Sequence, residues 1–73
     1  MIIATYTTNH RQDLSSLLRE GLMLIASNER AVFLQCQHAT LEAAIANQTR
    51  LNQKGFQIII TKTKRLIKEQ DHA

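Results

Sequence analysis

The hydrophobic pattern at the two ends of the chain predicts β-strands. Residues 1–8, MIIATYTT, are rich in β-branched and aromatic side chains, which favour extended backbone. Residues 56–64, FQIIITKTK, form a second such run with three consecutive isoleucines at its centre. The polar segment NHRQD, residues 9–13, interrupts the first run, and Asn9 or Asp13 can cap a helix that follows.

The segment 38–54, HATLEAAIANQTRLNQK, has the clearest helical pattern. Leu41, Ala44, Ile45 and Leu51 fall on one stripe at helical spacing, and Gln48 interrupts that stripe. Thr40 can cap the start of the helix, and Glu42 lies in the first turn, where the helix dipole favours a carboxylate. Gly55 follows Lys54 and can supply the left-handed residue that ends the helix.

Residues 21–35, GLMLIASNERAVFLQ, fit two structures. A long helix over 12–27 is supported by apolar side chains at helical spacing, namely Leu14, Leu17, Leu18, Leu22 and Ile25. A hairpin is supported by Gly21, which can end a helix over 11–20, and by the apolar run LMLIA. The polar turn SNER then separates that run from a second one, AVFLQC, so residues 22–27 and 31–36 would pair.

The similarity of the two halves favours the hairpin. Residues 1–27 and residues 31–64 both read as strand, helix, glycine and apolar strand. Two such halves make an α+β protein, a compact βαββαβ ferredoxin-like sandwich. The alternative is βαβαβ with a long first helix over 12–27, and its parallel sheet would need helices on both faces.

Strand alternation divides the predicted sheet into a face that packs on the helices and an open face. The residues expected against the helices are Ala4, Tyr6, Val32, Leu34, Cys36, Phe56, Ile58 and Ile60. Those expected on the open face are Ile3, Thr5, Thr7, Met23, Ile25, Phe33, Gln35, Gln37, Gln57, Ile59, Thr61 and Thr63. With the usual strand order 4-1-3-2, an apolar band of Ile3, Ile25, Phe33 and Ile59 would lie side by side as a partner-binding surface.

Size and cysteine content favour a single small domain that associates. The 73 residues predict one domain over 1–68 and a frayed polar tail over 69–73. A chain this short buries little surface, and Cys36 has no intramolecular partner, so a homodimer is the expected supplement. His10, His38 and His72 lack metal-ligand spacing, and we predict no metal and no cofactor. The single cysteine, the absence of a signal peptide pattern and the lack of a long apolar run predict a cytoplasmic protein that does not enter a membrane.

The net charge of +3 permits a nucleic acid partner without requiring one. The basic residues near the C-terminus are candidate phosphate contacts: Lys62, Lys64, Arg65 and Lys68. Lysines on an edge strand also block pairing with other sheets, so these residues have a structural explanation too. Asn9, His10 and Arg11, in a strand-to-helix turn, are a candidate anion-binding group.

No catalytic constellation is present in the sequence. Cys36 and His38 share one face of a strand, but a buried thiol beside a histidine at a helix start is the simpler interpretation. We therefore expect no enzyme but a small regulatory module, a sheet-mediated homo-oligomer that binds or inhibits a protein partner. The alternative is a nucleic-acid-binding regulator that uses the basic C-terminal strand. A third possibility, a domain that senses a small ligand, has only the strand–helix–strand layout of residues 38–60 in its favour.

Overall fold

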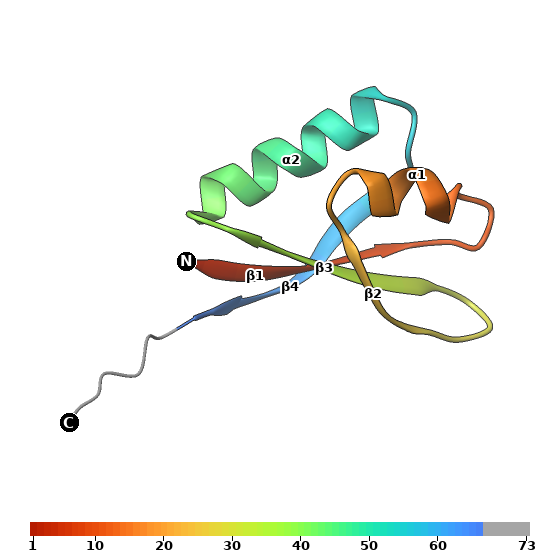
Figure 1. Ribbon diagram of the computed structural model, residues 1–73, viewed down its shortest axis with the longest axis horizontal. Helices are drawn as coiled ribbons and strands as arrows, with labels where there is room; N and C mark the ends of the chain where they lie inside the picture. The colour runs from red at the N-terminus through yellow and green to blue at the C-terminus, as the bar shows by residue number, and fades with distance from the viewer. Residues whose placement is uncertain (67–73) are drawn as a thin grey trace.

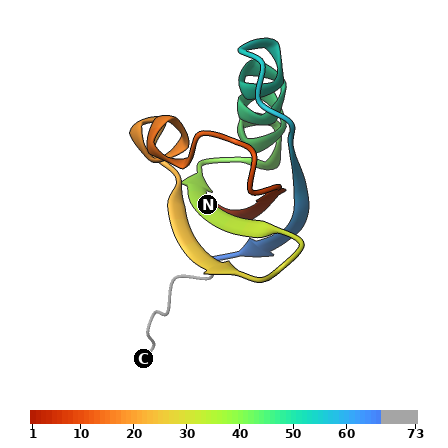
Figure 2. The ribbon, with the colours of Figure 1, turned by 90° about the vertical axis from the view of Figure 1, so that its right-hand side faces the viewer.

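The chain folds as βαββαβ, the arrangement that the symmetry of its halves predicts. The computed structural model describes residues 1–66, so the predicted domain end at 68 and the tail over 69–73 lie outside the described residues. The elements are β1 (Ile2–Thr8), α1 (Leu14–Arg19), β2 (Met23–Ser27), β3 (Val32–His38), α2 (Leu41–Gln53) and β4 (Ile58–Arg65). The strands form one antiparallel sheet in the order β2-β3-β1-β4, and both helices lie on the same face of it (Figure 1, Figure 2).

The stretch over 21–35 is a hairpin, and the long helix over 12–27 is wrong. Gly21 has φ of 95°, a conformation that side chains with a Cβ rarely adopt, and it ends α1 after Arg19 and Glu20. The turn between β2 and β3 is then held by Asn28. Its backbone N–H donates to the Ala31 carbonyl (2.9 Å), and its side-chain oxygen accepts from the backbone N–H groups of Arg30 (2.7 Å) and Ala31 (2.9 Å).

The helices begin where capping residues stand. Asp13 caps α1, which is shorter than the predicted 11–20, and its carboxylate accepts from the backbone N–H and the hydroxyl of Ser16. Thr40 caps α2 by accepting from the Ala43 backbone N–H (3.1 Å). The cap confirms the predicted start signal, while His38 belongs to the end of β3.

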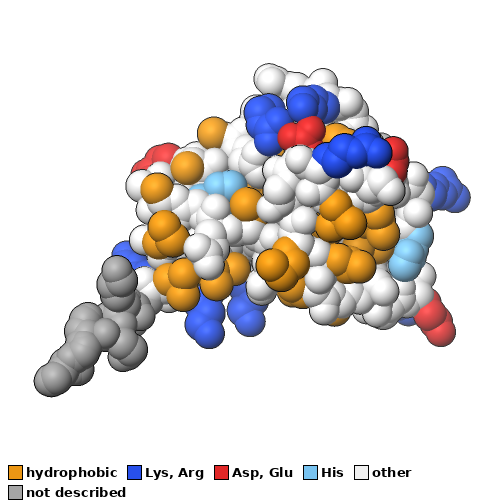
Figure 3. All heavy atoms as spheres, viewed as in Figure 1, with side chains coloured by type: hydrophobic (Ala, Val, Ile, Leu, Met, Phe, Trp, Pro, Cys, Tyr) orange, Lys and Arg blue, Asp and Glu red, His pale blue; other side chains and the backbone are white. Residues whose placement is uncertain are grey.

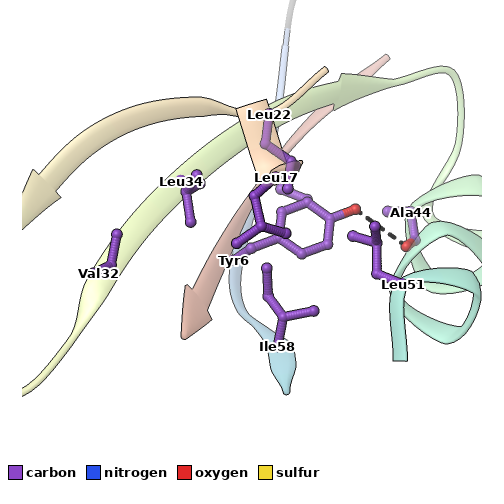
Figure 4. Packing of buried hydrophobic residues seen from close by; sticks show 9 residues of the cluster. Tyr6, Leu17, Leu22, Val32, Leu34, Ala44, Leu51 and Ile58 are labelled. Atoms are coloured by element: carbon purple, nitrogen blue, oxygen red, sulfur yellow. Dashed lines mark hydrogen bonds between the residues drawn. The ribbon is translucent and has the colours of Figure 1, made fainter. Parts of the chain in front are cut away.

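Tyr6 lies at the centre of a core that the helices and the sheet enclose (Figure 4). The largest fully buried side chains are Tyr6, Leu17, Val32, Leu34, Leu51 and Ile58. Ala4 is also buried, and Cys36, Phe56 and Ile60 pack against this cluster, so the predicted helix-facing side of the sheet is confirmed. Burial of these apolar side chains supplies the main stabilising term, roughly 1.5–3 kcal/mol for each large aliphatic or aromatic residue.

The apolar stripe of α2 is displaced from the predicted one. Ala44 and Leu51 are buried, but Leu41 and Ile45 are each about half exposed. The face turned to the sheet instead includes the polar residues Asn47, Gln48 and Asn52, whose side chains hydrogen-bond to β1 or β4. The predicted stripe differs from the observed one because a hydrophobic pattern cannot assign polar residues to the inner face of a helix.

One carboxylate joins the two helices. Glu20, directly after α1, accepts from Lys54 Nζ (2.7 Å) and from Arg50 Nη1 (2.8 Å) of α2. These hydrogen bonds, with that from Lys54 contributing most, hold the pKa of Glu20 below its usual range. Both ion pairs remain accessible to solvent, so their contribution to stability is small.

Candidate binding surface

The face of the sheet opposite the helices consists of three rows of neighbouring side chains. Residues directly opposite one another on antiparallel strands share a face, so the pairing register defines each row. The rows, read from β4 through β1 and β3 to β2, are Ile59–Thr7–Phe33–Ala26, Lys62–Thr5–Gln35–Met23, and Lys64–Ile3–Gln37. We call the surface made by these rows the open face.

A β-bulge in β4 determines which side chains of that strand reach the open face. Tyr6 pairs with Ile60, but the preceding residue, Thr5, pairs with Lys62, so Thr61 is an extra residue in β4. The extra residue reverses the alternation beyond it. Lys62 therefore shares the open face with Thr5, and Thr63 lies opposite buried Ala4 on the helix side.

The predicted side of Thr63 is wrong for this reason, whereas the side predicted for Thr61 is confirmed. The Thr61 hydroxyl hydrogen-bonds the Thr7 hydroxyl (2.8 Å) on the open face. Strict alternation had left Lys62 and Lys64 off this face. In Figure 3 basic side chains project from the underside of the sheet, away from the helices.

The predicted apolar band is only partly formed. Ile3, Ile25 and Phe33 line one hollow of about 450 Å³, together with Thr5, Ala26, Gln35, Lys62 and Lys64. Ile59 is outside it, because the register places Ile59 opposite Thr7, two rows away from Ile3. Ile59 does not lie beside Ile3 as predicted, and it is 56% exposed at the far edge.

The β4 edge of the sheet is protected by polar and charged side chains. From α2, Gln48 Oε1 accepts from the Ile60 backbone N–H (2.7 Å), and the Asn52 amide donates to the Ile58 carbonyl (3.0 Å). The second half of β4 carries lysines and an arginine, which oppose pairing with another strand. Gln48, the residue that interrupts the apolar stripe of α2, thus satisfies the backbone of an edge strand.

Among the described residues, the β2 edge has neither hydrogen-bonding cover from a helix nor charged side chains. All five residues of β2, MLIAS, are exposed, and none is charged or a proline. Met23 is 67% exposed, and Leu24 and Ile25 are each 44% exposed. Figure 3 shows hydrophobic side chains at the surface over the α1 and β2 region. An edge strand of this composition is a ready template for pairing with another chain.

The candidate phosphate contacts separate on the structure. Lys62 and Lys64 lie on the open face, whereas Arg65 pairs opposite Ile2 on the helix side of the sheet. Lys68 lies outside the described residues. The structure thus brings two of the four candidates together, and both line the hollow that Phe33 also lines.

The predicted anion-binding turn is held by contacts within the protein. The Asn9 side-chain oxygen accepts from the Arg11 backbone N–H (2.9 Å), and His10 Nε2 donates to the Asn28 carbonyl, which ties this turn to the β2–β3 hairpin. The Asp13 carboxylate occupies the start of α1. Since a carboxylate already stands where an anion would bind, the geometry gives the site at Asn9, His10 and Arg11 no support.

Cys36 and His38 share the helix side of β3, but hydrogen bonds direct each to a different partner. The Cys36 thiol donates to the Gln37 carbonyl (3.6 Å), and His38 Nε2 lies 2.8 Å from the Tyr6 hydroxyl. Burial raises the pKa of the Cys36 thiol and lowers the pKa of His38. The thiol is therefore protonated and the imidazole neutral at neutral pH, which favours a structural role for both.

Sequence reasoning missed the polar cluster around Tyr6. Its hydroxyl donates to the Ala44 carbonyl (3.3 Å) and accepts from the Asn47 amide (3.1 Å), in addition to its bond with His38. Burial raises the pKa of Tyr6, so the phenol stays protonated and acts as a hydrogen-bonding hub. A tyrosine at a core position of a strand, which requires partners for its hydroxyl, was the available signal.

Comparisons of the chain with family models, with curated proteins and with solved structures gave no match. Neither described helix is long and apolar enough to cross a membrane. Within residues 1–66, no group of three or more histidine, cysteine or acidic side chains is placed to hold a metal ion. The candidate surface therefore rests on its own geometry: an apolar, uncharged β2 edge and an open face on which two lysines and an aromatic ring line one hollow.

Proposed function

We propose that the protein is a small, non-catalytic regulatory module that pairs with a second copy of itself through β2 and acts by binding a protein partner. The observation that supports the pairing is the difference between the two sheet edges. The β4 edge is covered by α2 side chains and by charge, whereas the β2 edge is apolar and uncovered.

A second copy is a suitable occupant of the β2 edge because antiparallel pairing of identical strands is self-complementary. A two-fold axis through the centre of β2 would bring the same surface of each copy into contact. Since MLIAS carries no charge, the two strands would meet without repulsion between like charges. The pairing would cover Met23, Leu24 and Ile25 and would add to the small core of a short chain.

The experiment compares two lysine substitutions on opposite edges of the sheet. Sedimentation velocity is measured from micromolar to near-millimolar concentration for the wild type, Ile25→Lys and Ile59→Lys. Ile25 lies on β2 and Ile59 on β4, and both are exposed in the protomer, so the substitutions are chemically matched. We expect a dimer for the wild type and for Ile59→Lys, and a monomer for Ile25→Lys, because the two-fold axis through the centre of β2 would set the two lysines against each other.

Far-UV circular dichroism and thermal melting establish that both variants remain folded. A wild type that is monomeric at the highest concentration would remove the proposal. Loss of the dimer in Ile59→Lys but not in Ile25→Lys would place the interface at the β4 side of the sheet instead.

A further inference from the structure

The open face has the electrostatic character of a surface for an anionic chain. None of the four strands contains an aspartate or glutamate. The bulge at Thr61 adds Lys62 and Lys64 to this face. The ion pairs within residues 1–66 are those of Glu20 with Arg50 and Lys54, between the helices, so they leave these two lysines for other contacts.

An aromatic side chain stands within reach of those lysines. Phe33 lies on β3, an inner strand of the sheet, is partly exposed, and lines the same hollow as Lys62 and Lys64. Since β1 alone separates β3 from β4, and Lys62 lies one row from Phe33, the two residues are roughly 12 Å apart along the diagonal of the sheet. The ring therefore offers a stacking surface with positive charge to one side.

Neutral polar groups occupy the space between the ring and the lysines. Gln35 is two residues from Phe33 on the same face, and its amide donates to the Thr5 hydroxyl (3.3 Å). That hydrogen bond orients the amide and leaves its carbonyl oxygen as a hydrogen-bond acceptor. Such a group can contact the edge of a base without adding charge.

We propose that the open face binds single-stranded nucleic acid, with a base stacked on Phe33 and phosphates beside Lys62 and Lys64. A single strand is the required form, because a base paired within a duplex does not expose its ring face for stacking. An acidic peptide would satisfy the two lysines but would gain nothing specific from the ring. The inference goes beyond the proposed function and does not depend on the pairing of β2.

The strength of binding follows from the small number of charges. Each phosphate neutralised on a single strand contributes about −0.7 to the slope of log affinity against log salt concentration. Two lysines therefore predict a slope near −1.4, shallow enough for detectable binding at moderate salt. Stacking of one base on Phe33 predicts that Phe33→Leu weakens binding by about 5- to 150-fold.

The test uses fluorescence anisotropy with a labelled single-stranded oligonucleotide of mixed sequence, in both RNA and DNA form, titrated at several salt concentrations. The variants are Phe33→Leu and the pair Lys62→Gln with Lys64→Gln. The matched control is Arg19→Gln with Arg30→Gln, which removes the same charge from exposed positions outside the strands. Melting curves verify that each variant is folded, and sedimentation velocity verifies its oligomeric state.

The proposal expects saturable binding, with a slope of log affinity against log salt concentration near −1.4 for the wild type. The slope should be flatter by about 1.4 in the variant with Lys62→Gln and Lys64→Gln, and it should be unchanged in the variant with Arg19→Gln and Arg30→Gln. Equal weakening by both pairs would mean general attraction to a basic protein and would overturn it. Equal affinity of the wild type and Phe33→Leu for the oligonucleotide would also overturn it. The same holds if an acidic peptide competes fully and binds Phe33→Leu as tightly as the wild type. A change of oligomeric state in Phe33→Leu would assign this face to self-association and would likewise overturn the proposal.

Discussion

Deletion of Thr61 is predicted to leave the fold and the open face intact, although it removes a residue from the middle of a strand. Tyr6 pairs with Ile60 and Thr5 pairs with Lys62, so Thr61 alone is without a cross-strand partner. If Thr61 is deleted, Ile60 and Lys62 become neighbours in the chain, and the same pairs form a regular ladder. Lys62 remains on the open face and Ile60 remains against the core.

The expected cost is the difference between two small terms. Thr61 contributes an exposed hydroxyl hydrogen bond to Thr7, worth about 0.5–1.5 kcal/mol. Against this loss, the deletion removes a bulge residue that disrupts the ladder. We therefore expect the free energy of unfolding to stay within about 1 kcal/mol of the wild-type value, or about 4–8 °C in melting temperature for a domain of this size.

The control is deletion of Ile59, two residues earlier in β4. If Lys62 stays opposite Thr5 in that variant, Ile60 moves to the open face and Thr61 takes its place against the core. Replacing a partly buried isoleucine by threonine and losing the hydrogen bond to Gln48 should cost about 2–3 kcal/mol.

Urea denaturation followed by circular dichroism measures both deletions. The register, and with it the position of the lysines, would be refuted if deletion of Thr61 destabilised the protein as much as deletion of Ile59.

Two further predictions concern the buried polar cluster. Tyr6→Phe should lower the free energy of unfolding by about 1–3 kcal/mol in urea denaturation, because Asn47 and His38 lose their shared partner; an unchanged midpoint would contradict the hub. Burial lowers the pKa of His38 in the folded protein, so the unfolded chain takes up the proton first, and stability should decline as pH falls below about 6.5. His38→Gln should remove that decline while leaving the later loss, at lower pH, from Glu20 and Asp13, whose pKa values are lowered when folded; an identical pH profile in the variant would refute the assignment.

The order of the elements was predictable because each boundary has a local chemical cause. Gly21 and Gly55 both adopt positive φ and end the two helices, and Thr40 caps the second. These signals repeat in the two halves of the chain, and the repetition distinguished the hairpin from a long helix that the leucine spacing supported equally well. The sides of β1 and β3 followed from alternation, since neither strand contains an extra residue when paired with the other.

The candidate surface was less predictable because it depends on pairing between distant residues. No feature of the sequence ITKTK marks Thr61 as an extra residue, and only its register against Tyr6 and Thr5 does so. The same limit applies to β2, where the irregularity falls at Ile25. A hydrophobic pattern also cannot assign Gln48 to a backbone group of β4, although a polar residue on an otherwise apolar stripe is a sign that such a partner exists.

The two proposals concern different parts of the sheet and reinforce each other through symmetry. An antiparallel β2–β2 pair keeps the open faces of both copies on the same side, because residues opposite each other across antiparallel strands share a face. The combined sheet would run from one β4 to the other, about 34 Å for seven strand spacings. Its lysines would then lie toward the two outer edges, with both copies of Phe33 between them. A single nucleic acid strand that reaches both halves would be held twice, and the second contact would form at a high effective concentration. Each copy contributes only two lysines and one aromatic ring to the open face. Pairing through β2 would therefore raise the affinity for a nucleic acid strand without adding any further residue.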